Sequence, residues 1–262
     1  MRPGVAKDPD RLLAQVRTRY AQVASRASFS PPSNGCCDPS AAIPIGYAPD
    51  ELATLPAGAN LDLGCGSPTS LLSLHPGEVV VDLGSGAGID CFLASKRVGP
   101  RGRVIGVDMT PEMLAKARAL ARSGRYRNVE FRLGEIEHLP VVDRSADVVL
   151  SNCVINLAPD KGAVYREAYR VLRPGGRLAV SDVVATRRIA AKERDDPALW
   201  TSCSSGAMEI PRLTTLLRRV GFTEIGIDVA SSTQPADSLK EQASLGVVAA
   251  AIRATKRRTR TE

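Results

Sequence analysis

The feature that most constrains the fold is an apolar strand followed at once by a glycine-rich turn and a helix. Val79–Leu83 is predicted as a buried strand, and a helix is predicted over Ile89–Val98. Between them lie Gly84, Gly86 and Gly88. Glycine tolerates positive backbone dihedrals and lets the main chain approach a ligand closely. This order of elements is typical of a nucleotide-binding turn at the start of a crossover helix.

The alternation of strand and helix continues to the end of the chain. Further elements are predicted as strands Arg103–Val107, Val129–Leu133, Ala146–Ser151 and Arg177–Ser181, a helix opened by Thr110 and Pro111, a helix Lys161–Val171, a turn Pro174–Gly176, a helix Pro211–Val220, and strands Glu224–Val229 and about Gly246–Thr255. Uninterrupted apolar strands joined by helices predict a parallel sheet covered on both faces. We therefore expect an α/β, Rossmann-like fold.

Four parts are expected along the chain. Residues 1–74 form an N-terminal cap helix and cysteine-bearing loops, 75–184 the core that binds the nucleotide, 185–255 a crossover or lid segment with the final strands, and 256–262 a basic tail. The cap helix is predicted from Asp8 to about Ala27, from apolar residues at helical spacing. Ser28–Pro49 is rich in Ser, Pro and Gly, which predicts a long irregular loop of the kind that usually carries function.

The charge and composition argue against two classes of partner. The net charge is +7, but residues 253–262 carry five basic residues against one acidic residue. The chain has only 4 Phe, 5 Tyr and 1 Trp, too few to support a base-stacking surface, so we expect no nucleic-acid partner. No apolar run is long enough to cross a bilayer and the first twenty residues lack a signal-peptide core, so we expect no membrane partner. The expectation is a cytoplasmic monomer.

A second glycine turn, Asp62–Gly66, looks like a copy of Asp82–Gly86. Pro68 follows its glycines, and only twelve residues separate Gly66 from the next strand. A crossover helix with its turns does not fit comfortably in that length. We therefore expect that only the turn at Asp82 binds a nucleotide.

Acidic residues beside this turn indicate which nucleotide it takes. Asp82 lies two residues before Gly84 and would repel a pyrophosphate, and Ile89 stands where a dinucleotide-binding turn has its last glycine. Asp108 ends the next strand, where an acid can bind ribose hydroxyls. A nucleoside with a cationic tail, such as S-adenosylmethionine, fits better than NAD or FAD. In the alternative interpretation, Asp82 only caps the turn.

Several segments also match the motifs of one family. These segments are Gly64–Pro68, Asp82–Cys91, Val107–Met113, Gly134–Pro140, Ser151–Leu157, Pro159–Lys161, Ser181–Val184 and Trp200–Ala207. In them the sequence resembles the arsenite S-adenosylmethionine methyltransferases, from about Tyr20 to Phe222. The cysteine contexts at 65, 153 and 203 are the most specific part of the resemblance, because related methyltransferases share the glycine turn.

The resemblance implies a seven-stranded class I S-adenosylmethionine-dependent methyltransferase sheet and an arsenite methyltransferase that detoxifies arsenic. It implies that Cys65, Cys153 and Cys203 hold trivalent arsenic, with an accessory role for Cys36 or Cys37. The expected cofactor contacts are Asp82, Gly84, Ser85, Gly86, Gly88, Asp108, Met109, Glu135, Ile136 and Asn152. A thiol reductant of the thioredoxin or glutathione type is expected, and the arsenic could arrive as a thiol conjugate. The alternatives are methylation of a small organic molecule, and a protein without catalysis that either binds metalloid through its thiols or associates with nucleic acid through its basic tail.

The cysteine set suits this chemistry. Trivalent arsenic is soft and binds thiolates, whereas the six cysteines and two histidines lack zinc-ligand spacing. Cys153 follows a strand at the carboxyl edge of the expected sheet, where open α/β sheets bind ligands. Cys203 lies beyond Pro197 in the crossover segment, and Cys91 is expected in the core of a helix. Met109 is expected either to pack on adenine or to serve as a core residue at a helix start.

Overall fold

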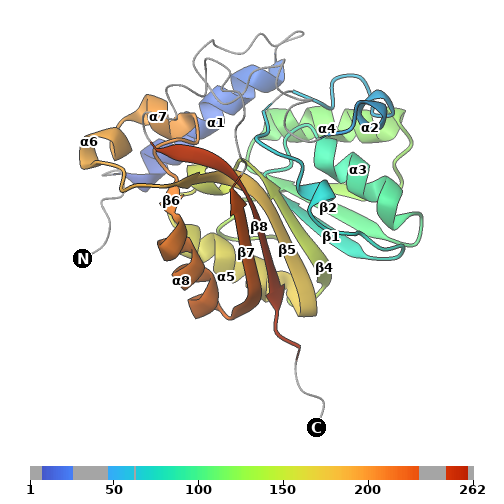
Figure 1. Ribbon diagram of the computed structural model, residues 1–262. Helices are drawn as coiled ribbons and strands as arrows, with labels where there is room; N and C mark the ends of the chain where they lie inside the picture. The colour runs from blue at the N-terminus through green and yellow to red at the C-terminus, as the bar shows by residue number, and fades with distance from the viewer. Residues whose placement is uncertain (1–7, 26–46, 62, 230–245, 259–262) are drawn as a thin grey trace.

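The computed structural model describes residues 8–25, 47–61, 63–229 and 246–258 (Figure 1). Its strands are β1 (Val79–Leu83), β2 (Arg103–Asp108), β3 (Val129–Leu133), β4 (Ala146–Asn152), β5 (Leu172–Ala185), β6 (Met208–Glu209), β7 (Phe222–Val229) and β8 (Val247–Lys256). Seven of them follow the order β3-β2-β1-β4-β5-β8-β7, and the two-residue β6 pairs with β5 at the side. The predicted seven-stranded α/β sheet is therefore confirmed, with one short addition.

The prediction of a wholly parallel sheet is wrong at one edge. Strands β1 to β5 are parallel, but β8 runs antiparallel to both β5 and β7. Strands β7 and β8 are consecutive in the chain and pair directly with each other, and antiparallel pairing of consecutive strands requires no helical crossover. The turn predicted at Pro174–Gly176 lies inside β5, where the pairing with β4 shifts register between Ala146 and Val148.

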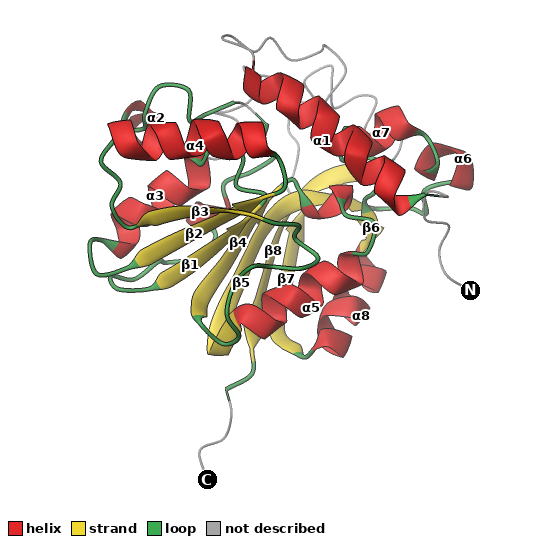
Figure 2. Cartoon of the chain, turned by 180° about the vertical axis from the view of Figure 1, so that it is seen from behind, coloured by secondary structure: helices red, strands yellow, loops and turns green. Residues whose placement is uncertain are grey.

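Helices cover both faces of the sheet (Figure 2). The helical segments are α1 (Pro9–Ser25), α2 (Pro49–Ala53), η2 (Pro68–Ser70), α3 (Ile89–Val98), α4 (Pro111–Ser123), η3 (Ile155–Leu157), α5 (Lys161–Val171), α6 (Ala191–Arg194), α7 (Pro197–Thr201) and α8 (Ile210–Val220). Helices α3 and α4 lie on one face, and α5 and α8 on the other. None of the helices that the structure describes combines the length and apolar character of a membrane span.

Alternation along the strands divides the core between the two faces. Val80 and Val148 belong to the cluster under α3 and α4, whereas their neighbours Val81 and Val149 belong to the cluster under α5 and α8. Successive side chains of a strand point to opposite faces, so each strand is buried on both sides. This burial fixes the strands and holds the loops at their carboxyl ends in place.

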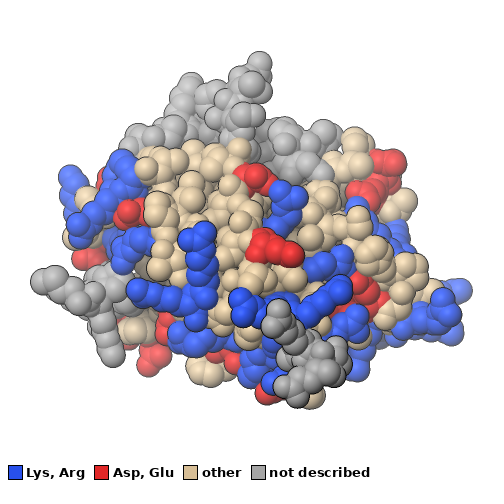
Figure 3. Space-filling model, turned by 60° about the horizontal axis from the view of Figure 1, so that its bottom comes forward, with Lys and Arg blue, Asp and Glu red and all other residues tan. Residues whose placement is uncertain are grey.

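A third apolar cluster lies under the cap formed by α1 and α7. It joins Leu12 and Val16 of α1 to Trp200, and it also contains Cys153 and Cys203. The cap therefore covers the carboxyl ends of the strands. Basic side chains, interspersed with acidic ones, spread over the opposite end of the molecule (Figure 3).

Candidate active site

A cavity opens at the carboxyl ends of the strands, beneath α1. Apolar side chains with a few polar groups among them line it, which is typical of a small-molecule site. Predicted cofactor residues that line it are Asp82, Gly84, Ser85, Gly86, Asp108, Met109, Ile136 and Asn152. Eight of the ten predicted cofactor residues therefore line one cavity.

Two predicted cofactor residues lie outside the cavity wall. Gly88 is the residue before α3, with φ +98°, and a Cβ there would lie 2.8 Å from Phe131 and 3.0 Å from Phe92. The absence of a side chain at Gly88 therefore allows α3 to pack closely on the sheet. Glu135 pairs with Arg17 of α1 at 3.3 Å, and Glu137 lines the cavity nearby.

The carboxylate of Asp108 is held by the two loops that it lies between. It accepts hydrogen bonds from the backbone N–H of Gly86 at 2.9 Å and of Thr110 at 2.8 Å. Burial raises its pKa, and these donors oppose the rise. Thr110 precedes α4 as predicted, but its side chain makes no capping hydrogen bond.

Asp82 is almost fully buried at the start of the glycine turn. It accepts a hydrogen bond from the Cys91 thiol at 3.2 Å. Burial, followed by the negative charge of Asp90, raises the pKa of Asp82 well above its ordinary value. Such a carboxyl would be stabilised by a cationic ligand. Cys91 is wholly buried in α3, which confirms its predicted place in the core.

A network of three side chains in the cavity wall, two of them buried and one partly buried, was not predicted from the sequence. The hydroxyl of Tyr47 donates to the carboxylate of Asp90 at 2.9 Å and accepts from Nδ2 of Asn152 at 2.8 Å. Oδ1 of Asn152 accepts the backbone N–H of Cys65 at 3.1 Å. Asn152 therefore links the cofactor cavity to the loop that carries a candidate arsenic ligand.

The pH dependence of stability tests this network. Burial raises the pKa of Asp90 to about 6, while hydrogen bonds from Tyr47 and Asn152 oppose the rise. Because this pKa lies above the ordinary value, ionisation opposes folding, and the stabilisation present in acid is lost as the pH rises toward 6. Between pH 4 and 6 the unfolding free energy of Asp90→Asn should fall less steeply than that of the unsubstituted protein, as measured by urea unfolding without cofactor. Equal slopes in the two proteins would refute the assignment.

In the part of the chain that the structure describes, the first glycine turn lacks the strand and the crossover helix that flank the turn at Asp82. Among the described residues no strand precedes it, only the three-residue η2 follows it, and Asp62 lies outside the described range. Its glycines instead allow close packing. A Cβ on Gly64 would lie 2.7 Å from Nδ2 of Asn152, and one on Gly66 would lie 2.6 Å from Cβ of Ser181. The turn thus rests on the ends of β4 and β5 and delivers Cys65 there.

Cys65 and Cys153 are joined in a disulfide, 88 residues apart in sequence, with 5.8 Å between their Cα atoms. Cys153 directly follows β4 and Cys203 follows α7, and both have positive φ, +55° and +64°. The Cys203 thiol donates to the backbone carbonyl of Cys153 at 3.1 Å. Non-glycine residues held in this backbone region cluster at functional sites. Cys65 and Cys203 therefore both contact Cys153, whereas Cys36 and Cys37 lie outside the described residues.

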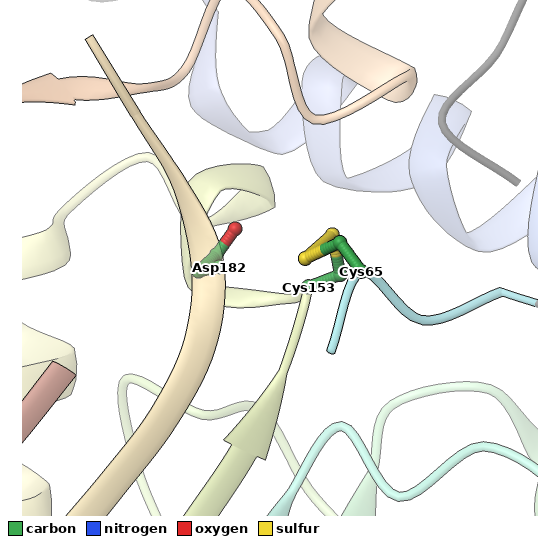
Figure 4. Close-up of side chains that lie close together, drawn as sticks. All are labelled: Cys65, Cys153 and Asp182. Carbon is green, nitrogen blue, oxygen red and sulfur yellow. A yellow bond between two sulfur atoms is a disulfide. The ribbon is translucent and has the colours of Figure 1, made fainter. Parts of the chain in front are cut away.

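Asp182 of β5 is beside this pair. Its carboxylate and the sulfurs of Cys65 and Cys153 all lie within 4.8 Å of one another (Figure 4). Cys153 and Gly64 also line the cofactor cavity. The cysteine pair and the predicted cofactor cavity thus adjoin each other at Cys153.

Comparison with known proteins agrees with this geometry. Residues 74–221 match the model of a methyltransferase domain. The structure resembles the crystal structure of an arsenic(III) S-adenosylmethionine methyltransferase from Chlamydomonas reinhardtii, with a TM-score of 0.67. The two sequences are 35% identical, and the match covers 82% of this chain and 76% of that one. The chain belongs to the arsenite methyltransferase family.

Relatives of this family extend beyond the matched region. The chain is 47% identical to the arsenite methyltransferase of Halobacterium salinarum over 84% of its own length and 60% of the relative's. It is 43% identical to that of Aquipseudomonas alcaligenes over 80% of its own length and 61% of the relative's. The chain thus spans about three fifths of the curated family members that it matches.

Proposed function

We propose that the chain transfers a methyl group from S-adenosylmethionine to trivalent arsenic held by the thiolates of Cys65, Cys153 and Cys203. The observation that carries the proposal is that Cys65 and Cys203 both contact Cys153, which lines the cofactor cavity. Cys65 and Cys153 are bonded to each other, and the thiol of Cys203 contacts the backbone of Cys153. Cysteines brought this close to one another suit a thiophilic, three-coordinate substrate.

The cavity residues fit the proposed methyl donor. The Oγ atom of Ser85 is buried in the cavity wall with no hydrogen-bond partner among the described residues, so a bound ligand could satisfy it. Asp108 is placed for ribose hydroxyls, and the buried carboxyls of Asp82 and Asp90 suit a cationic amino-acid end. S-adenosylmethionine supplies an electrophilic methyl group when bound.

The cysteines bind and orient the substrate. Arsenite reacts with three thiols to form three As–S bonds, and the three thiol protons leave with the three hydroxyl groups as water. Three sulfurs at the base of a pyramid leave the arsenic lone pair at its apex, free to face the cavity. Because the lone pair is the nucleophile, the protein's task is chiefly positioning. The cap cluster around Trp200 and Leu12 keeps water from this region.

The disulfide implies a partner of reducing character. Cys65 and Cys153 offer no thiolates while they are bonded to each other. Two electrons and two protons from a dithiol of the thioredoxin type, or from two molecules of a glutathione-type thiol, would release both thiols. The reductant therefore acts before arsenic binds.

Arsenic binding can be followed through Trp200, the single tryptophan of the chain. Trp200 is 4% exposed, and its backbone carbonyl accepts the N–H of Cys203 at 2.9 Å. We expect titration of the reduced protein with arsenite to change the fluorescence of Trp200 and to saturate at about one arsenic per chain. The oxidised protein should bind at least about tenfold more weakly, since only one of the three thiols remains. Equal binding by the two forms would contradict the proposed ligand set.

A further inference from the structure

Asp182 has no role in the proposed ligand set, yet it occupies a buried position beside it. The residue lies near the carboxyl end of β5 and is 3% exposed. Its carboxylate projects toward the Cys65–Cys153 pair (Figure 4), with oxygen and sulfur atoms within 4.8 Å of one another. A buried carboxylate at this distance acts on whatever charge the substrate carries.

Four N–H groups hold this carboxylate in place. Oδ2 accepts the backbone N–H of Ile155 at 3.1 Å and of Asn156 at 3.3 Å. Oδ1 accepts Nδ2 of Asn156 at 2.8 Å and the backbone N–H of Val183 at 2.8 Å. Hydrogen bonds to a carboxylate favour its ionised form, so Asp182 is suited to be a fixed negative charge rather than a base.

The proposed reaction moves a positive charge into this region. The arsenic lone pair forms the As–C bond as the donor's S–C bond breaks, and the electron pair of that bond stays on the donor sulfur. The unit positive charge of the sulfonium therefore passes to arsenic. By contrast, arsenite and the trithiolate complex formed from three thiols are both neutral, so binding changes no charge beside Asp182.

We propose that Asp182 stabilises the positive charge that develops on arsenic during methyl transfer, an inference that rests on the proposed function. Fixed groups that face a developing charge in a water-poor site lower the barrier without reorganising. The negative charge of Asp182 also acts on the ammonium group of Lys161. Burial lowers the pKa of Lys161 to about 8, and Asp182 opposes that fall.

Because the arsenic becomes charged only during methyl transfer, we expect Asp182 to affect the transfer step and not arsenite binding.

The test separates binding from transfer in the full-length reduced protein. Arsenite binding is measured by Trp200 fluorescence, cofactor binding by calorimetry, and methyl transfer in a single turnover. Asp182→Asn should bind arsenite and S-adenosylmethionine within about threefold of the unsubstituted protein and transfer the methyl group roughly 10- to 100-fold more slowly. Asp182→Glu, which keeps the charge, should recover part of the rate.

Asp147→Asn is the matched control. Asp147 is another buried aspartate, and it lies at the amino end of β4, away from the cysteine pair at the carboxyl end. It accepts the N–H of Val79 at 2.8 Å and pairs with Arg173. Its replacement should lower stability and leave the transfer rate of the folded protein unchanged.

Three results would overturn the inference. They are an Asp182→Asn protein that transfers at the unsubstituted rate, one that loses arsenite binding in parallel with transfer, and a glutamate variant as slow as the asparagine variant. If the unsubstituted protein itself forms no methylated arsenic, the proposed function fails and takes this inference with it.

Discussion

Cys153→Ser should lower arsenic methylation by at least about a thousandfold while leaving S-adenosylmethionine binding intact. Cys153 directly follows β4, lines the cofactor cavity and is bonded to Cys65. Serine keeps nearly the same shape, but its oxygen is a hard ligand that does not replace a thiolate on soft arsenic. The two remaining thiols no longer fix the arsenic for in-line attack on the methyl group. Positioning of the two reactants supplies a large share of the rate enhancement in such a reaction.

Folding and the affinity for S-adenosylmethionine are the controls for Cys153→Ser. The backbone at Cys153 has φ +55°, and serine meets the same steric cost there as cysteine, so folding should change little. Calorimetry should give the same affinity for S-adenosylmethionine, and thermal unfolding in the reduced state should change only slightly. Methylation at the unsubstituted rate would refute Cys153 as an arsenic ligand.

Gly84→Ala should lower the affinity for S-adenosylmethionine by at least about tenfold, which titration calorimetry would measure. Gly84 lines the cavity with φ +66°, and an added Cβ would lie 2.5 Å from Cγ2 and 2.7 Å from Cβ of Val154. The positive dihedral alone costs about 1–2 kcal/mol with a side chain. Because Val154 adjoins Cys153, relief of the clash would displace the thiol site as well as the glycine turn.

Gly77→Ala separates strain from cavity effects. Gly77 also has a positive dihedral, φ +89°, but a Cβ there would meet no atom within 4 Å, and the residue does not line the cavity. It should therefore lose about 1 kcal/mol of stability and keep its affinity for S-adenosylmethionine. Equal loss of affinity in the two variants would mean that Gly84 acts through general destabilisation.

Where periodicity and end signals agreed, the sequence predicted elements to the residue. Val129–Leu133, Ile89–Val98 and Lys161–Val171 have the same bounds in the structure as in the prediction. For α3 the positive-φ glycines at both ends stop the helix, and for α5 the side chain of Asp160 caps the first turn by accepting the N–H of Ala163. Local chemistry was sufficient for these elements.

Features that depend on contacts between distant segments could not be predicted in this way. The Tyr47–Asp90–Asn152 network joins a loop, a helix and a strand end, and no spacing in the sequence indicates that they meet. The antiparallel direction of β8 and the position of Asp182 beside Cys65 are also products of the assembled sheet. The resemblance predicted the three cysteines, but Asn152 as the link between Cys65 and the cavity emerged only from the geometry.

Methyl transfer to arsenic is tested most directly by product analysis with the purified 262-residue chain. Arsenite and S-adenosylmethionine with a labelled methyl group are incubated with the protein and a dithiol or glutathione-type reductant, and the arsenic species are separated by chromatography. The account predicts labelled methylarsenic, formed with an equal amount of S-adenosylhomocysteine for each methyl group and absent without reductant. A protein that binds S-adenosylmethionine and saturates with arsenite, yet forms no methylated arsenic with either class of reductant, would contradict it.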